Sequence, residues 1–269
     1  MDVTNAISVA RLTDIGLLRE RNEDAVASEL TTGLVMVADG MGGYKGGAIA
    51  SEIAILVVTA ELAEFAYGGN KKNKALTVAN MLTGAVAKAN DTIYKASQQN
   101  AHCEGMGATL VSGVFADNKL TVGHIGDSRL YRLRDGVLVQ LTEDHSLLQE
   151  QLNAGLITEE QAKASNDGHL VTRALGTDPE VELELHEYDV EVEDFYLLCS
   201  DGLTDLIDDV DIKTVLLDSA GDIDLAASNL VKLANNHGGK DNISVVIAFI
   251  KNKFPKKRRW VSELLGLSK

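Results

Sequence analysis

Four aspartates of this chain each stand where an apolar run meets a glycine- or asparagine-bearing turn. They are Asp39, Asp127, Asp201 and Asp241. An unpaired carboxylate at a buried strand end is costly, so four such groups from distant parts of the chain are best explained by shared cations. Oxygen ligands with no supporting Cys or His cluster favour Mg²⁺ or Mn²⁺ over zinc or copper. The pattern therefore predicts a fold in which these four positions meet at one metal site.

The size and charge of the chain narrow the functions open to it. It has 269 residues, 45% of them hydrophobic, which is enough for a sizeable core and near the upper end of one domain. The formal charge of -15 and pI ≈ 4.8 argue against a nucleic-acid surface, because binding the phosphate backbone needs a basic face. Part of the acidity lies in residues 180–194, where Val and Leu alternate with Glu. We interpret that stretch as an exposed strand and turn rather than a site.

The cysteines and the apolar runs indicate the compartment. Only two cysteines occur, Cys103 and Cys199, and neither has Cys-x-x-Cys or Cys/His spacing, which favours a reduced, cytoplasmic protein. No cleavage pattern of a secretory signal opens the chain. The apolar run 53–60 is far shorter than the roughly 20 residues that cross a bilayer. We therefore expect one catalytic domain over residues 1–250, in the cytoplasm.

Apolar patterning predicts both strands and helices. Runs rich in Val, Ile and Leu that are bounded by Gly, Asn or Asp predict strands over residues 33–38, 107–116, 119–126, 129–134, 137–141, 181–190, 194–200 and 242–250. Apolar residues at helical spacing predict helices over residues 46–67, 74–99, 204–218 and 222–236, with a turn at 68–73 and an N-cap at Asp222. Very short turns separate several consecutive strands, so much of the sheet must be antiparallel, with helices on its faces.

Residues 143–172 differ from the rest of the chain. They are polar, contain Ala, Gly, Asn and Ser, and have little apolar content from which to build a core. This composition predicts a mobile flap beside the site.

The turn after Asp39 is glycine-rich. Gly40-Met41-Gly42-Gly43 allows the backbone to turn tightly and to present a carbonyl beside the carboxylate. A nucleotide-binding loop is the main alternative, but no Gly-Lys-Ser/Thr follows, and Lys45 stands where a dinucleotide fingerprint needs its third glycine. Asp-Gly alone is usually only a turn, so the assignment of Asp39 depends on the other aspartates.

The charged segment 19–24 allows two interpretations. Its sequence, Arg-Glu-Arg-Asn-Glu-Asp, places two guanidinium groups beside carboxylates, as a phosphate clamp next to a metal ligand would. An exposed charged turn has the same composition. On these residues alone, the exposed turn is the better interpretation.

Together, the ordered motifs resemble those of the PP2C-type metal-dependent serine/threonine protein phosphatases, in their short bacterial form. The motifs are Arg19-x-x-Asn22-Glu23-Asp24, Val37-Ala38-Asp39-Gly40-Met41-Gly42-Gly43, Gly105-Met106-Gly107-Ala108-Thr109-Leu110, Gly126-Asp127-Ser128-Arg129, Leu141-Thr142-Glu143-Asp144-His145-Ser146, Leu198-Cys199-Ser200-Asp201-Gly202-Leu203-Thr204-Asp205 and Lys240-Asp241-Asn242-Ile243-Ser244. They span about residues 8–250 in the family's order. The resemblance implies an α+β fold, a four-layer α/β/β/α sandwich of two mainly antiparallel sheets flanked by helix pairs, with the small flap near 143–172.

The resemblance also implies a role for each matching residue. Asp39 would bridge two Mn²⁺ or Mg²⁺ ions and, with Arg19 and Asp201, would form the catalytic set. The remaining expected metal ligands are the Gly40 carbonyl, Asp241, Glu23 acting through a water, and, for a third and weaker cation, Asp127 with Asp201 and Asp205. Arg19 would hold the substrate phosphate, and Asn242 would support the ligands from behind.

The activity implied is hydrolysis of phosphoserine and phosphothreonine on proteins by a metal-activated water, opposing a serine/threonine kinase. A cysteine-nucleophile phosphatase is excluded because it needs a Cys-x5-Arg spacing, whereas Thr109 and Asp205 stand at that distance from the two cysteines. The remaining alternative is a catalytically silent module that binds phosphoproteins or acts as a scaffold. Its signature would be a lost ligand, and every expected aspartate is present. We expect a monomer with phosphorylated proteins as partners and no nucleic-acid partner.

One departure from the family concerns the proton donor. Many eukaryotic members have a histidine between the two glycines that follow the bridging aspartate, where this chain has Met41. The candidate proton donors nearest to the motifs are His145, His169 and His124, although a structural role is the better interpretation of each. Water on a bound cation is the other candidate for the donor.

Residues 251–269 form a basic and apolar tail. Lys256-Lys257-Arg258-Arg259 precedes Trp260 and several aliphatic residues that would share one helical face. Such a segment favours weak docking on an anionic membrane or an acidic partner. A solvated, frayed terminus is the simpler interpretation for so short a stretch.

Overall fold

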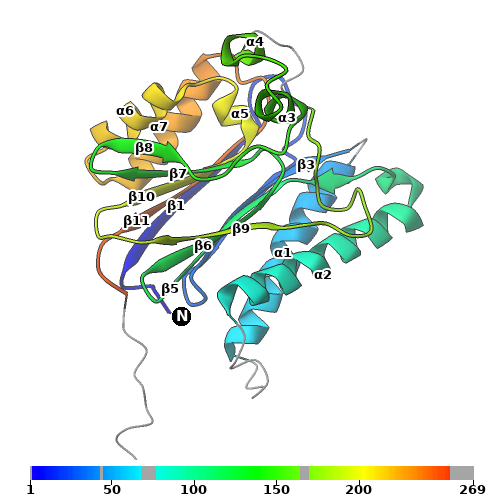
Figure 1. Cartoon of the computed structure of the whole chain (residues 1–269), viewed down its shortest axis with the longest axis horizontal. Helices are drawn as coiled ribbons and strands as arrows, with labels where there is room; N and C mark the ends of the chain where they lie inside the picture. The colour runs from blue at the N-terminus through cyan, green and yellow to red at the C-terminus, as the bar shows by residue number, and fades with distance from the viewer. Residues whose placement is uncertain (1, 43–44, 68–76, 164–169, 255–269) are drawn as a thin grey trace, which may run out of the picture.

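The computed structural model describes residues 2–42, 45–67, 77–163 and 170–254. In this part of the chain two antiparallel sheets stack face to face, and helices cover both outer faces (Figure 1). The elements are β1 (Ile7–Asp14), β2 (Asp24–Glu29), β3 (Leu34–Met41), α1 (Gly46–Tyr67), α2 (Val78–Gln99), a 3-10 helix (Ala101–Cys103), β4 (Gly107–Ala108), β5 (Leu110–Ala116), β6 (Lys119–Ile125), β7 (Arg129–Arg134), β8 (Val137–Gln140), α3 (Leu147–Asn153), α4 (Glu159–Lys163), β9 (Glu184–Asp189), β10 (Phe195–Cys199), α5 (Asp201–Thr204), α6 (Asp209–Asp218), α7 (Ile223–Asn236) and β11 (Ile243–Ile250). The predicted four-layer sandwich is confirmed.

Strand order explains how distant segments meet. One sheet has the order β1-β11-β10-β7-β8, and the other has the order β2-β3-β5-β6-β9, with β4 paired to the end of β3. The chain enters and leaves through neighbouring strands, since β1 pairs with β11 in antiparallel register from Ile7↔Ile250 to Asp14↔Ile243. The segment after β1 therefore lies beside the segment before β11.

Three hydrophobic cores hold the layers together. Along β3, Leu34, Met36 and Ala38 face the core shared with α1 and α2, whereas Val35 and Val37 face the core between the sheets. Strand β11 divides its apolar residues in the same way, between the inter-sheet core and the core under α6 and α7. Central strands buried on both faces read as continuous apolar runs, which is why they were recognisable from the sequence.

Several element boundaries differ from the prediction. Strands β1 and β2 were missed, because their exposed or half-buried positions carry polar residues such as Arg11 and Ser28. The predicted strand 107–116 is divided at Thr109 into β4 and β5. The predicted helix 204–218 was wrong: α5 begins earlier, at Asp201, and α6 begins only at Asp209, where the Asp208 side chain accepts a hydrogen bond from the Asp211 amide. Helical spacing was continuous across this break, so the pattern hid it.

The other helix predictions fare better. Helix α1 has the predicted bounds, and Asp222 caps α7 as expected by accepting from the Leu225 amide. Helix α2 begins at Val78 after an N-cap at Thr77. The predicted turn 68–73 lies outside the described residues, as do residues 74–76.

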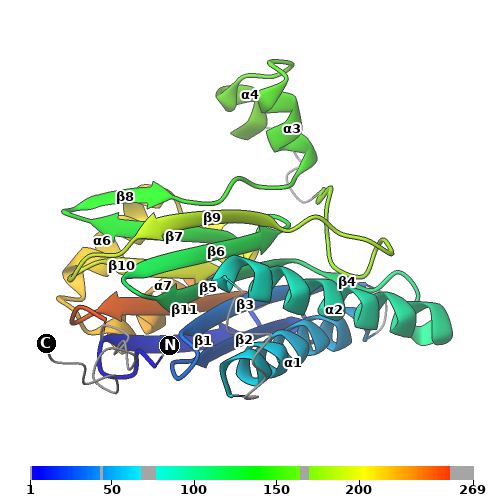
Figure 2. The ribbon, with the colours of Figure 1, turned by 60° about the horizontal axis from the view of Figure 1, so that its bottom comes forward.

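The predicted flap and acidic strand both lie at the periphery. Helices α3 and α4 stand away from the two sheets (Figure 2), and residues 164–169 of the predicted flap lie outside the described part of the chain. Strand β9, from the acidic stretch, is an edge strand with mostly half-buried or exposed side chains, as predicted. Among the described residues, no helix combines the length and apolar character needed to cross a membrane.

Candidate active site

A cleft of about 1150 Å³ opens where β3, β10 and the segment before β11 meet. The structure brings every residue of the predicted site to its lining: Arg19, Glu23, Asp39, Gly40, Asp127, Asp201, Asp205, Asp241 and Asn242. Leu148, Gln149 and Leu152 of α3 form part of the wall. Residues more than 200 positions apart in sequence thus share one surface, because β1 and β11 are neighbours and the two sheets are stacked.

Asp39 is placed by the hydrogen bonds of its own backbone. It lies near the end of β3, opposite Asp24 on β2. The Asp39 carbonyl accepts from the Thr109 amide at 2.8 Å, and the Asp39 amide donates to the Thr109 hydroxyl oxygen at 3.2 Å. That hydroxyl also pairs with the Ser128 hydroxyl at 2.7 Å. Thr109 thus ties the end of β3 to the turn that carries Asp127.

Gly40 and Glu23 occupy the same corner beside the start of α1. The Gly40 amide donates to the Glu23 carbonyl at 3.2 Å. A Cβ at Gly40 would lie 2.1 Å from the Gly47 carbonyl oxygen, and a Cβ at Gly47 would lie 2.7 Å from Glu23 Oε2 and 2.6 Å from the Gly40 carbonyl oxygen. A side chain at either position would collide with these oxygens, so glycine at both positions is needed for this packing.

Asp241 and Arg19 form the opposite side of the cleft. Arg19 Nη2 donates to Asp241 Oδ2 at 2.5 Å, and the arginine side chain is half exposed. Burial lowers the pKa of Arg19, but this hydrogen bond and the charges of Asp241, Asp201 and Asp39 outweigh burial and raise it. The guanidinium therefore stays charged at the mouth of the cleft.

Asn242 holds this side in place. Its Oδ1 accepts from the Glu23 amide at 2.8 Å, while its Nδ2 donates to the carbonyls of Ile15 and Arg21 at 3.0 and 2.9 Å. One buried side chain thus fixes the loop that carries both Arg19 and Glu23. The predicted supporting position of Asn242 agrees with these bonds.

The carboxylates repel one another. Burial first, and then the charges of Asp24, Asp201 and Asp127, raise the pKa of Asp39 well above its usual value. Burial and the charges of Asp201 and Asp144 raise the pKa of Asp127 to about 7. Burial also raises the pKa of Glu23. A site built this way favours a bound cation over bare ionised carboxylates.

Asp24 belongs to the same group although the predicted site omitted it. Burial and the charge of Asp201 raise its pKa to about 6, against hydrogen bonds from Ser244 and Ser200 that lower it. The Ser200 hydroxyl donates to Asp24 Oδ2 at 2.8 Å, while Asp24 Oδ1 is buried without a hydrogen-bond partner among the described residues. An orphaned carboxylate oxygen beside Asp39 and Asp201 fits a divalent cation or its hydration shell. Asp24 could have been assigned from the sequence, because it follows Glu23 in the motif Asn22-Glu23-Asp24.

The donor set fits the predicted ions. Carboxylates, the Gly40 carbonyl and open cleft volume suit Mn²⁺ or Mg²⁺, which keep several waters, and none of the described residues that line the cleft is a cysteine or histidine. Met41 lies in this lining. His124 and His145 are buried outside it, so neither is positioned as the proton donor, and His169 lies outside the described residues.

The raised pKa values give a pH dependence for chelated protein. In EDTA, we expect the free energy of unfolding to fall as pH rises from about 4 to 7. In that window the folded state still holds a proton at Asp127, whose pKa is about 7, that the unfolded state has lost from a group of ordinary pKa 3.8. Urea unfolding across this range measures the slope, and Asp127→Asn should flatten it.

The matched control is Asp218→Asn, at the exposed end of α6, which should keep the wild-type slope. A slope unchanged by Asp127→Asn would show that Asp127 is not a strained carboxylate.

Comparison with known proteins agrees with this geometry. The protein phosphatase 2C family model matches residues 19–223. The chain is 39% identical to the serine/threonine protein phosphatase PstP of Mycobacterium tuberculosis, over 91% of this chain but only 45% of PstP. It is 34% identical to the serine/threonine phosphatase stp of Listeria monocytogenes, over 87% of this chain and 92% of that protein.

A solved structure has the same fold. The catalytic domain of PstP in complex with 2 manganese ions superposes with a TM-score of 0.80 at 36% identity, over 92% of this chain and 99% of that one. The six motifs from Arg19 to Asp205 lie within the residues that the family model matches, and the motif that carries Asp241 and Asn242 follows them in the chain. The chain belongs to the protein phosphatase 2C family.

Proposed function

We propose that this chain is a metal-dependent protein phosphatase that hydrolyses phosphoserine and phosphothreonine on proteins. The observation that carries the proposal is the cleft itself, where Asp39, Asp201 and Asp241 converge beside the charged guanidinium of Arg19. The names of the relatives support the substrate class. The alternative of a silent binding module has no support, because every predicted ligand is present in the lining.

Most of the acidic residues of the cleft are proposed to bind cations rather than the substrate. Asp39, Gly40, Asp201, Asp241 and Glu23 would hold two Mn²⁺ or Mg²⁺ ions, and Asp127 with Asp201 and Asp205 a third. When bound, such ions activate water for in-line attack on phosphorus and neutralise the charge that develops there.

Arg19 and Asn242 contribute through position. The guanidinium of Arg19 presents parallel N–H donors suited to two oxygens of a phosphoryl group. Asn242 keeps the Arg19 loop against Asp241 through its three hydrogen bonds. Met41 has no proton to donate, and the described part of the lining contains no histidine, which favours water in the cleft as the proton donor to the leaving oxygen.

The proposal extends to the domain bounds, oligomeric state, location and partners of the protein. Residues 1–250 form the catalytic domain, the protein acts as a monomer in the cytoplasm, and it opposes a serine/threonine kinase on phosphorylated proteins. For tail residues 251–269, of which 255–269 lie outside the described part of the chain, weak docking to an anionic membrane or an acidic partner is the second interpretation, after a solvated terminus. Both cysteines are buried and unpaired, which supports a reducing compartment.

Metal dependence is the direct test of the proposal. Hydrolysis of a phosphothreonine peptide should be abolished by EDTA and restored by Mn²⁺. Asp39→Asn should lower kcat on the order of a thousandfold, because a shared ligand supports several kcal/mol of transition-state stabilisation. Asp218→Asn, an exposed aspartate outside the cleft, serves as the control and should keep wild-type kcat. Full activity after exhaustive chelation would refute the mechanism.

The role of Arg19 is tested by its effect on KM. Arg19→Ala should raise KM for the phosphopeptide roughly tenfold or more with a smaller change in kcat, because a charge-assisted phosphate contact forms in the ground state as well as the transition state. Arg21→Ala is the matched control, since Arg21 lies two residues along and does not line the cleft. A larger defect from Arg21→Ala would show that the wrong guanidinium has been assigned.

A further inference from the structure

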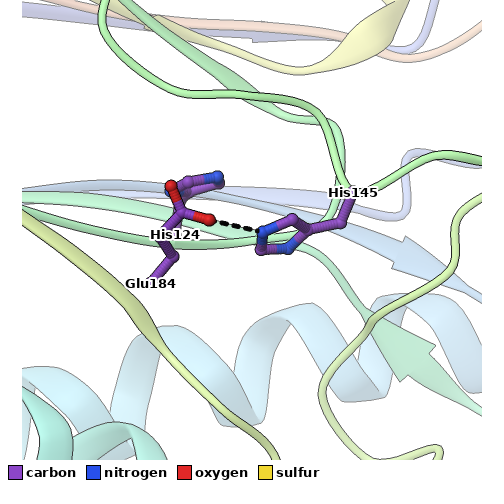
Figure 3. Close-up of side chains that lie close together, drawn as sticks. All are labelled: His124, His145 and Glu184. Carbon is purple, nitrogen blue, oxygen red and sulfur yellow. Dashed lines mark hydrogen bonds and ion pairs between the residues drawn. The ribbon is translucent and has the colours of Figure 1, made fainter. Parts of the chain in front are cut away.

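A cluster of titratable side chains lies outside the cleft and has no part in the mechanism above. It consists of His124 at the end of β6, His145 at the base of the α3–α4 segment and Glu184 at the start of β9 (Figure 3). Their potential ligand atoms lie within 4.8 Å of one another, and both histidines are buried, His124 at 0% and His145 at 7% exposure. A shared metal ion is the first hypothesis to test against the geometry.

The hydrogen bonds fix the proton on each ring. His145 Nδ1 accepts from the Gly126 amide at 3.2 Å, so the ring proton is on Nε2, where it is donated to Glu184 Oε2 at 3.1 Å. His124 Nε2 lies 2.8 Å from the Glu143 carbonyl oxygen, which can only accept, so His124 also carries its proton on Nε2. The nitrogen of His145 that faces Glu184 therefore has no lone pair to offer a metal.

Ring orientation also argues against a shared metal. The two imidazoles are stacked, with centroids 4.6 Å apart and planes inclined by 22°. The lone pair of an imidazole nitrogen lies in the ring plane, so lone pairs of two stacked rings do not converge on one point. Within the cluster, a hydrogen bond joins His145 to Glu184, whose other oxygen pairs with His186 Nε2 at 2.7 Å, while His124 is stacked on His145 and bonds to the Glu143 carbonyl.

His145 links three parts of the molecule. Its amide donates to the Gly126 carbonyl at 3.0 Å, so Gly126 is bonded to His145 through both its N–H and its C=O. The His145 carbonyl accepts from the Thr172 amide at 2.8 Å, next to the bridge between Ser146 and Val171. The same residue thus joins the turn before Asp127, both ends of the α3–α4 segment and, through its ring, strand β9.

The turn at Gly126 has little freedom of its own. Its φ is +101°, and a Cβ there would lie 2.6 Å from the side chain of Thr109, the residue that holds the end of β3. Asp127 follows directly and is buried at 6% exposure in the lining of the cleft. A shift of the Gly126 amide would therefore move Asp127 relative to Asp39.

We propose that His145 is a positioning residue: its Nδ1 holds the Gly126 amide and so sets the place of the Asp127 carboxylate in the cleft. The proposal rests on the proposed function, since the place of Asp127 matters only if the cleft holds cations. Supporting residues of this kind commonly change metal affinity or activity by roughly ten- to hundredfold when lost.

Three substitutions of His145 separate its two ring nitrogens. His145→Asn keeps a short acceptor where Nδ1 lies but cannot reach Glu184. His145→Gln places an amide N–H where Nε2 lies, which can reach Glu184 but leaves Gly126 without its acceptor. His145→Ala removes both, and Glu184→Gln keeps an acceptor oxygen for Nε2.

Two readouts follow these variants in the full chain. The first is hydrogen exchange of the Gly126 amide in the presence of EDTA, and the second is the Mn²⁺ concentration that gives half-maximal phosphopeptide hydrolysis. We expect exchange to be about fivefold faster or more in the Ala and Gln variants, and near wild type in the Asn variant and in Glu184→Gln. The Mn²⁺ requirement should rise roughly tenfold or more in the Ala and Gln variants, with rescue by Asn.

The outcomes are distinguishable from failure of the phosphatase proposal. Wild-type inactivity would refute that proposal, whereas active wild type with an unchanged Mn²⁺ requirement in a folded His145→Ala variant would overturn the positioning role alone. Rescue by Gln rather than Asn would also overturn it, because the Glu184 contact would then be the important one. Stoichiometric Zn²⁺ binding by Asp39→Asn protein that is lost in an Asp39→Asn/His124→Ala double variant would establish a metal site and overturn the positioning role.

Discussion

Repulsion among carboxylates at the end of the sandwich is the constraint that the rest of this structure has to overcome. Burial first, and then the nearby charge of Asp201, raise the pKa of Asp24, Asp39 and Asp127. Placing several carboxylates together in a buried site is unfavourable, because burial and the like charges both oppose their ionisation. The arrangement persists because extensive packing elsewhere fixes the strands that carry the aspartates.

That packing has an identifiable form. The two sheets share a core, and each sheet shares another with its helices, so both faces of the central strands are buried. Strand ends are then placed by layers that cannot shift independently. Thr109 and Asn242 then fix the backbone of two predicted ligands, because they accept hydrogen bonds from the Asp39 amide and the Glu23 amide respectively. Uncompensated charge at the site is thus supported by neutral, well-paired neighbours.

Sequence patterns anticipated much of this arrangement, for physical reasons that differ between elements. Central strands such as β3 and β11 were visible because burial on both faces leaves them almost wholly apolar. Strand β2, at the edge of its sheet, was not visible, because its half-buried positions accommodate polar residues such as Asp24, Ser28 and Glu29. The site aspartates were recognisable from their place beside strand ends, and the family resemblance supplied their order.

What the sequence could not supply were contacts between distant segments. Glu184 was interpreted as part of a solvated strand, which is right for β9 as a whole, but pairing with His145 across 39 residues gives this one carboxylate another role. The break between α5 and α6 was hidden because helical spacing continues across it, while Asp208 caps the second helix. Asp24 was overlooked because its neighbours Ser200 and Asp201 belong to the other sheet's β10 end.

The central claim is that the cleft carboxylates exist to hold divalent cations, and a crystal grown with MnCl₂ tests it most directly. Anomalous scattering collected at the manganese edge locates Mn²⁺ without assumptions about geometry. We expect strong peaks between Asp39, Asp201 and Asp241, with Arg19 released from its contact with Asp241 or shared with a bound anion. A cleft without anomalous peaks at saturating Mn²⁺, or peaks only beside His124, His145 and Glu184, would contradict it.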